Sequence, residues 1–148
     1  MRLSITAIGK MRGSVFEAGF ALYQSRLQPP LILREIDDKK AATKDEQGKL
    51  ILAALPVHAI IVALDEHGTA WSSLDFAQKI TDYGNAGASE IAFVIGGADG
   101  LSQAVRDRAH AVFSLGRITL PHLLARLVLM EQIYRAQTIR QNHPYHRA

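Results

Sequence analysis

Short β-type runs alternate with helical segments along the whole sequence, and this alternation limits the folds that the chain can adopt. Five apolar or alternating runs are typical of strands: RLSITAIG (2–9), LILREI (31–36), HAIIVAL (58–64), EIAFVI (90–95) and AVFSL (111–115). A segment with helical character follows each run. Regular alternation of this kind predicts a mostly parallel sheet with helices on both faces, which is an α/β domain.

Capping residues, glycine and proline mark where the helices should begin and end. Ser14 with Glu17, and Thr43 with Glu46, have the spacing of capping boxes, while Ser72 and Ser102 are candidate N-caps. The corresponding helices should stop before Pro29-Pro30, at Pro56, at Gly84 and after QAVRDRAHA (103–111). A final helix is predicted over 123–139, and the segments 37–45 and 65–71 are predicted to be a linker and a loop.

Size and composition favour one soluble domain over residues 1–148. Hydrophobic residues make up 48% and charged residues 21% of the chain, as in ordinary globular proteins, and no internal repeat is visible. The absence of cysteine excludes disulfides, thiolate metal sites and cysteine nucleophiles. No apolar run approaches the length of a membrane span, and MRLSITAIGK does not form a signal-peptide core. We therefore expect a cytoplasmic protein without membrane contact.

Positive charge is concentrated in the last third of the chain. The formal net charge is +3, but residues 101–148 hold seven Arg against two acidic residues, together with four of the six His. Arginine's planar guanidinium suits bidentate contact with phosphate. This pattern is compatible with polyanion binding and equally with a solvated helix face.

The predicted last helix, LLARLVLMEQIYRAQTI (123–139), is apolar over much more than one stripe. A helix of this kind needs burial on two sides. Packing within one chain accounts for one side, and a second chain would account for the other. We therefore predict a homodimer.

Three strand ends carry loops with unusual residues: LDEHG (64–68), IGGADG (95–100) and LGRITLPH (115–122). Ligands of open α/β sheets bind beyond the carboxyl ends of the strands, so these loops would form one pocket if their strands are neighbours. Gly96 and Gly97 would let the backbone approach a ligand, although such a pair also serves as an ordinary turn. The spacing GxGxxG and the phosphate loop GxxxxGK[ST] are both absent, which argues against dinucleotide enzymes and P-loop phosphoryl transfer.

The tail QNHPYHRA (141–148) contains His143, Tyr145, His146 and Arg147. Chain ends are usually bland unless something holds them, so these side chains are either solvated or complete a site. His122 has two open interpretations, as a structural residue at a helix start or as a catalytic one. The histidines lack a metal-binding spacing such as HExxH, and we predict no metal site.

Taken in order, several segments resemble the ribosomal RNA large subunit methyltransferase H family (RlmH) of the SPOUT superfamily. The resemblance covers essentially the whole chain. The segments are MRLSITAIGK, Leu64-Asp65-x-x-Gly68, FVIGGADGL, SLGRITLPH, the stretch from Arg126 to Ala136 with Glu131 and YRA, and the terminal NHPYHR.

The resemblance implies a SPOUT-type α/β domain with a C-terminal trefoil knot, S-adenosylmethionine as methyl donor and a homodimer with sites at its interface. It implies methylation at N3 of a pseudouridine in the 23S rRNA of the ribosome. By position, the implied cofactor contacts are Leu64, Gly96, Leu115, Gly116, Arg117, Ile118, Thr119 and Leu120.

For such a reaction, His122, His143 and His146 are candidates to remove the N3 proton, because the unperturbed pKa of a histidine side chain suits a general base. Tyr145 is a candidate to stack on the target base, and Arg147 to hold phosphate. His122 has the further interpretation of supporting the cofactor loop. Two other functions stay open: a SPOUT methyltransferase that acts on transfer RNA, and a non-catalytic ribosome- or RNA-binding module.

Overall fold

Five parallel strands form the central sheet of the protein, whose residues 1–147 are described by a computed structural model. The strands lie in the order β2-β1-β4-β3-β5, and every neighbouring pair is parallel. Their bounds are Arg2–Ile8 for β1, Ile32–Ile36 for β2, Ile60–Ala70 for β3, Glu90–Ile95 for β4 and Ala111–Ser114 for β5. The predicted parallel sheet is confirmed.

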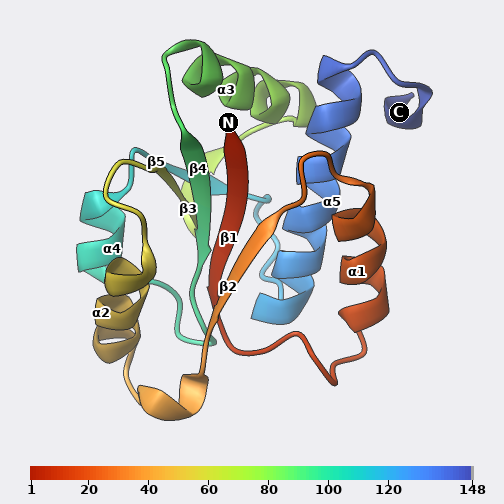
Figure 1. Cartoon of the computed structure of the whole chain (residues 1–148). Helices are drawn as coiled ribbons and strands as arrows, with labels where there is room; N and C mark the ends of the chain where they lie inside the picture. The colour runs from red at the N-terminus through yellow and green to blue at the C-terminus, as the bar shows by residue number, and fades with distance from the viewer. Residues whose placement is uncertain (148) are drawn as a thin grey trace.

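Helices cover both faces of this sheet, which confirms the α/β prediction. Figure 1 shows α2 and α4 on one side of the strands and α1 and α5 on the other. One apolar cluster includes Phe20 of α1, Phe76 of α3 and Leu129 of α5, and a second includes Ile51 of α2 and Val105 of α4. The bounds are Glu17–Arg26 for α1, Lys44–Ala54 for α2, Ser73–Asn85 for α3, Gln103–Arg108 for α4 and His122–Arg140 for α5, with 3₁₀ turns η1 (Asp38–Lys40) and η2 (Pro144–His146). The trefoil knot stays a prediction.

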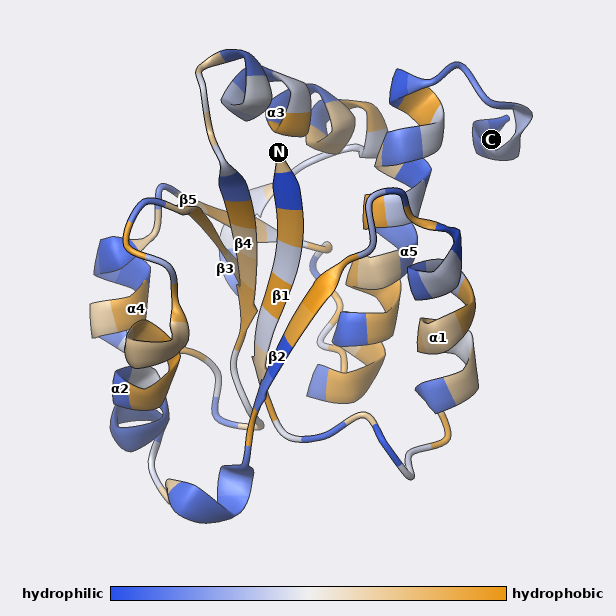
Figure 2. Cartoon of the chain, in the orientation of Figure 1, coloured by the Kyte–Doolittle hydropathy of each residue, from blue (hydrophilic) through white to orange (hydrophobic). Residues whose placement is uncertain are grey.

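Hydrophobic residues make up much of the strands and occur along α1 and α5 between polar ones, as Figure 2 shows. On α5 the fully buried apolar residues include Leu129, Met130 and Ile133, while Leu124 and Val128 are only half buried. Much of the apolar surface of α5 is therefore covered within one chain by the sheet, α1 and α3. The homodimer stays a prediction. No helix within residues 1–147 combines the length and the apolar character that a membrane crossing requires.

Three of the four predicted N-caps form. Thr43 Oγ1 accepts a hydrogen bond from the Glu46 backbone N–H at 3.1 Å, and Ser102 caps α4 in the same way. The predicted capping box at Thr43 is incomplete, because the Glu46 carboxylate accepts from the Ala42 N–H rather than from Thr43. Ser72 and Asp75 form a complete capping box at α3, because each side chain accepts from the backbone N–H of the other residue at 3.0 Å. Helix α4 ends at Arg108, three residues earlier than predicted.

The predicted capping box of Ser14 and Glu17 was wrong. Helix α1 begins at Glu17 and has no side-chain cap. Ser14 lies too early and accepts from the Phe16 N–H, while the Glu17 carboxylate accepts from the Gly13 N–H at 2.8 Å. Both side chains thus stabilise the turn before the helix rather than the helix itself.

The predicted loop at 65–71 was also wrong, because β3 continues to Ala70. Its pairing with β5 is interrupted after Leu64 and resumes at Thr69, which lies opposite Phe113. Gly68 passes so close to β5 that an added Cβ would lie 2.7 Å from the Phe113 carbonyl carbon. This part of β3 is held by backbone pairing rather than by burial, so its sequence lacks an apolar strand pattern.

A buried carboxylate ties three strands together at the amino edge of the sheet. Glu90, at the start of β4, accepts hydrogen bonds from Ser4 Oγ at 2.6 Å and from the Arg34 guanidinium at 2.7 Å. Burial of Glu90 acts to raise its pKa, but the bonds from Arg34 and Ser4 outweigh it and hold the pKa below the ordinary value. The carboxylate is therefore charged in the folded protein at neutral pH.

Candidate functional site

The three loops that the sequence predicts to converge line one hollow of about 380 Å³ at the carboxyl edge of the sheet. We call it the carboxyl-edge hollow. Strands β4, β3 and β5 are neighbours, with Ile95 opposite Leu64 and Leu64 opposite Phe113, so the loops begin side by side. The lining residues are Lys44, Leu64 to His67, Ile95 to Gly100, Arg106, Leu115, Gly116, Ile118 to Leu120, His122 and Ala125.

Seven of the eight predicted cofactor residues line this hollow: Leu64, Gly96, Leu115, Gly116, Ile118, Thr119 and Leu120. The eighth, Arg117, is exposed and does not line it. The loop that carries Arg117 is fixed to the neighbouring strand, because Thr119 Oγ1 donates a hydrogen bond to Glu66 at 2.9 Å. The structure therefore groups these seven residues and leaves Arg117 pointing into solvent from the same loop.

Glycine is required where the loops of the hollow pack on themselves. An added Cβ at Gly96 would lie 2.5 Å from the Gly100 carbonyl oxygen. Gly116 has φ +131, a backbone conformation that side chains other than glycine rarely adopt. Both glycines thus serve the shape of the hollow.

The wall of the hollow contains an ion pair that the sequence analysis did not predict. Arg106 of α4 and Asp65 of β3 form an ion pair at 2.6 Å, and the Asp65 side chain is only 6% exposed. Lys44, at the start of α2, adds a second cation to the lining. Asp65 belongs to a loop that the sequence singles out, but its pairing with a residue 41 positions away depends on the tertiary fold.

His122, the first residue of α5, borders the hollow with its ring against the end of β1. A Cβ added at Gly9 would lie 3.2 Å from His122 Cε1. Burial lowers the pKa of His122, and the nearby Arg126 lowers it further, despite the opposing influence of Asp38 and the Ile8 carbonyl. The imidazole is therefore neutral at pH 7. Its Nδ1 is buried and has no hydrogen-bond partner among residues 1–147.

Beneath His122 lies the fully buried guanidinium of Arg126. It donates hydrogen bonds to Glu35 at 2.7 Å and to the carbonyls of Ile8 at 2.8 Å and Gly9 at 3.0 Å. Glu35 also accepts from the Met11 N–H at 2.7 Å. This network fixes the end of β1, next to the hollow, to β2 and α5.

The tail folds back onto the last turns of α5. Asn142 has φ 54 and reverses the chain after the helix. The Tyr145 hydroxyl then donates to Glu131 at 2.9 Å, and its ring packs edge-on against Tyr134 with centroids 4.8 Å apart. The Arg135 guanidinium lies 5.1 Å from the centre of the Tyr145 ring.

The tail histidines differ in their surroundings. His143 Nδ1 accepts a hydrogen bond from the Tyr145 N–H at 3.1 Å. His146 is half buried, and its Nδ1 has no partner among residues 1–147. The same part of the chain contains no group of three His, Cys, Asp or Glu side chains placed to hold a metal ion.

Comparison with known proteins connects this geometry to a family. The family described as "Predicted SPOUT methyltransferase" matches residues 1–146. Three similar proteins are each named ribosomal RNA large subunit methyltransferase H. The one from Paramagnetospirillum magneticum is 44% identical over 151 residues, covering 99% of both chains. The one from Rhodospirillum centenum is 45% identical, and the match covers 100% of both chains. The one from Prochlorococcus marinus (strain MIT 9313) is also 45% identical, and the match covers 97% of this chain and 95% of the relative.

The chain belongs to the RlmH family. In this RlmH-family chain, the predicted site residues fall into two groups at opposite ends of α5. His122 begins the helix beside the seven residues of the hollow, whereas His143, Tyr145, His146 and Arg147 follow its last residue. A helix of 19 residues separates its ends by about 27 Å at a rise of ~1.5 Å per residue. Figure 1 shows the tail residues up to 147 beside the end of α5, away from its start. Within one chain the structure does not bring the two groups together.

Proposed function

We propose that the protein transfers a methyl group from S-adenosylmethionine to N3 of a pseudouridine in 23S rRNA, in the cytoplasm. The observation that carries this proposal is the full-length similarity, at 44–45% identity, to proteins named ribosomal RNA large subunit methyltransferase H. The carboxyl-edge hollow and the histidine-containing tail supply chemically suitable groups. The pseudouridine and its N3 position come from the family resemblance.

The carboxyl-edge hollow is suited to hold the cofactor. Its volume of about 380 Å³ falls in the range of small-molecule sites. Leu64, Leu115 and Leu120 offer apolar contacts, and the backbone at Gly96 offers groups that can hydrogen-bond an adenine edge. When bound, the sulfonium of S-adenosylmethionine supplies an electrophilic methyl group. The task left to the chain is to orient the acceptor and accept its proton.

We propose a homodimer in which the tail of one chain lies at the hollow of the other. The separation of about 27 Å along α5 prevents a chain from using its own tail at its own hollow. A second copy that packs against the half-buried Leu124 and Val128 would cover the remaining apolar part of α5. One chain would then bind the cofactor, and its partner would contribute the groups that face the RNA.

Of the three histidines, we propose His146 as the proton acceptor. The lowered pKa of His122 makes it a weaker base than an ordinary histidine, and its contact with Gly9 suits a supporting role for the hollow. His143 commits its Nδ1 lone pair to the Tyr145 N–H. His146 makes no such commitment among residues 1–147, and Arg147 beside it is exposed and can contact phosphate.

The decisive experiment is mass spectrometry of 23S rRNA fragments after incubation of the protein and S-adenosylmethionine with ribosomes that lack the modification. A gain of one methyl group on the pseudouridine is the expected result. Absence of methylation together with intact cofactor binding would refute this substrate and direct the search to transfer RNA. Absence of both would favour a non-catalytic binding module.

The shared site can be tested by complementation. Deletion of residues 143–148 should abolish methyl transfer and preserve cofactor binding, whereas Thr119→Trp should fill the hollow and abolish both. In a mixed dimer, the hollow of the truncated chain meets the tail of the Thr119→Trp chain, so one of the two sites is intact. Random exchange of equal amounts makes about half of the dimers mixed, so activity should return to about a quarter of the wild-type level. Failure to recover activity in verified mixed dimers would contradict the shared site.

A further inference from the structure

The segment that contains α1 after Glu17 and the segment from the end of α5 into the tail carry no acidic side chain. Residues 18–34 and 132–147 contain five Arg and two His but no Asp or Glu. Arg34 and Arg135 are neutralised by ion pairs with Glu90 and Glu131. Arg26 and Arg140 are exposed and form no ion pair with any residue in 1–147. Positive charge at this end of the molecule is therefore available to an external partner.

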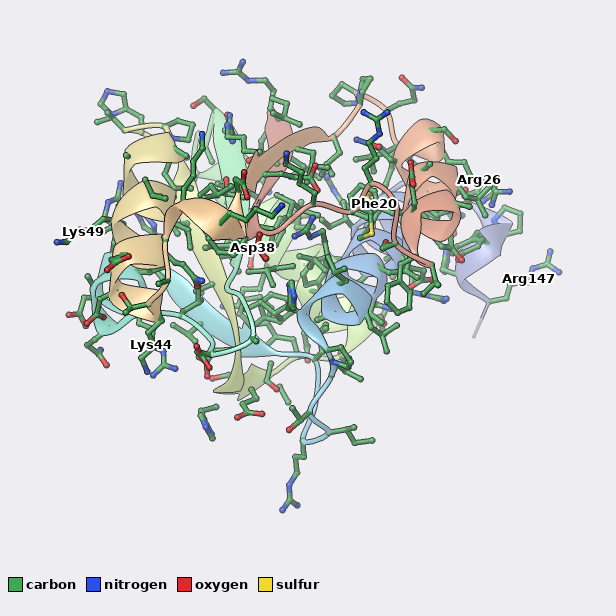
Figure 3. All side chains as sticks on the ribbon, turned by 90° about the horizontal axis from the view of Figure 1, so that it is seen from below. Phe20, Arg26, Asp38, Lys44, Lys49 and Arg147 are labelled. Carbon is green, nitrogen blue, oxygen red and sulfur yellow. The ribbon has the colours of Figure 1, made fainter. Side chains whose placement is uncertain are left out.

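These residues come from three segments that lie side by side. Tyr134 of α5 contacts both Tyr23 of α1, at 6.0 Å between ring centres, and Tyr145 of the tail. Just beyond α1, the Gln28 N–H donates to the Gln137 side chain at 3.2 Å. Figure 3 shows Arg26 and Arg147 on the same side of the molecule and Lys49 on the opposite side.

The tail is held firmly enough to present a defined surface. Glu131 accepts hydrogen bonds from Tyr145 and from two nitrogens of Arg135, at 2.7–3.0 Å. Its second carboxylate oxygen accepts from Gln132, whose side chain also accepts from Ser73 of α3. Glu131, which lies next to these segments, is thus hydrogen-bonded through both carboxylate oxygens and neutralised by Arg135.

Arg26 and Arg140 lie in the last turns of α1 and α5, where a cation also complements the helix dipole. That effect accounts for one arginine at each helix end. It does not account for the absence of acidic residues from both segments, nor for a tail that adds Arg147 and two histidines to the same surface. An external polyanion accounts for all of these features.

We propose that Arg26 and Arg140 bind the phosphate backbone of the RNA substrate and extend the tail into a continuous RNA-binding surface. We call this set, completed by His143, His146 and Arg147, the tail surface. The proposal rests on the RNA substrate proposed above. It assigns to α1 a function in substrate binding, because Arg26 would contact phosphates that flank the target nucleotide while the tail faces that nucleotide.

The test compares two single charge reversals on exposed helix positions, Arg26→Glu on α1 and Lys49→Glu on α2. Binding of the full-length protein to a 23S rRNA fragment is measured by fluorescence anisotropy from 50 to 300 mM salt. We expect Arg26→Glu to weaken binding by about tenfold at low salt and to reduce the slope of log K against log salt by about 0.7–0.9, the contribution of one phosphate. Arg140→Glu should behave like Arg26→Glu, and Lys49→Glu like the wild type.

Further measurements separate the alternatives. Cofactor binding by calorimetry and subunit assembly by light scattering should be unchanged in Arg26→Glu; loss of assembly would place Arg26 in a subunit interface and overturn the proposal. Equal losses of RNA binding in Arg26→Glu and Lys49→Glu would overturn it as well. A binding defect of Arg26→Glu that is seen with whole ribosomes but not with naked RNA would also overturn it, because it would indicate that Arg26 contacts an acidic protein surface. If RNA binding depends on Arg26 but the wild-type protein methylates no RNA, the proposed function is refuted and the RNA-binding proposal stands.

Discussion

Replacement of Arg126 by methionine should lower the free energy of unfolding by about 3–5 kcal/mol, the usual cost of breaking a buried ion pair from one side. The Arg126 side chain is fully buried, and it donates hydrogen bonds to Glu35, to the Ile8 carbonyl and to the Gly9 carbonyl. Methionine approximates the length of the arginine stem and keeps the apolar packing. The loss should therefore come from the polar partners rather than from a cavity.

The three partners should not contribute equally. Glu35 is 24% exposed and can be rehydrated once Arg126 is gone, so the loss of its ion pair should contribute least to the change in the free energy of unfolding. The carbonyls of Ile8 and Gly9 lose a charged donor in the interior, at about 1–3 kcal/mol for each group left unsatisfied. Glu35→Gln alone should cost less than Arg126→Met, and the double variant should cost less than the sum by about 0.5–3 kcal/mol because the residues are in direct contact.

Urea unfolding followed by far-ultraviolet circular dichroism measures these differences. Arg12→Met, which replaces an exposed arginine, is the matched control and should stay within about 0.5 kcal/mol of the wild type. If Arg126→Met lowers the free energy of unfolding by less than about 1 kcal/mol, and the slope of that free energy against urea concentration is unchanged, the reasoning is refuted. Because Arg126 fixes the end of β1 beside His122, cofactor binding should also weaken in a variant that still folds.

Three further predictions follow from the structure. Tyr145→Phe removes the hydroxyl that binds Glu131, so methyl transfer should fall while calorimetric cofactor binding stays unchanged; equal loss of both would contradict a role confined to the tail. Gly68→Ala should destabilise the fold, by about 1–3 kcal/mol in urea unfolding, since its Cβ would overlap the backbone of Phe113. The pKa of Glu90 is below its ordinary value in the folded state, so its contribution is present above the unfolded-state pKa and is lost as pH falls through the folded-state pKa. Glu90→Gln should therefore flatten the acid side of the stability profile, and a profile identical to that of the wild type would contradict this assignment.

Local signals in the sequence were sufficient to predict most helix and strand boundaries and the loops of the hollow. Ser72 and Ser102 could be recognised because an N-cap acts over three residues. The hollow could be predicted on the condition that the three strands are neighbours, because parallel strands place their carboxyl ends at one edge, and the order β4-β3-β5 meets that condition. The far half of β3 could not, since its polar residues pair with β5 through the backbone and show no apolar alternation.

Contacts between residues far apart in the sequence could not be predicted from local sequence patterns. The ion pair of Arg126 and Glu35 joins residues 91 positions apart, and Arg106 meets Asp65 across 41. One signal did exist for the first pair. A single arginine within the apolar run LLARLVLM indicates a buried charge in need of partners, because an exposed position would not be surrounded by so many apolar neighbours on a packed helix.

The position of the tail depends on the length of α5 and on the turn at Asn142 rather than on any pattern in the tail itself. The left-handed conformation of Asn142 returns the chain to the helix, so that Tyr145 reaches Glu131, 14 positions earlier. To bring the tail to its own hollow, the chain would have to unwind much of α5 and expose Leu129 and Ile133, which are fully buried in the main core. Burial of each such side chain contributes about 1.5–3 kcal/mol, and that loss is comparable with the whole stability of a domain of this size once several are exposed. A second chain that supplies its tail avoids this cost, and this is the physical argument for the proposed homodimer.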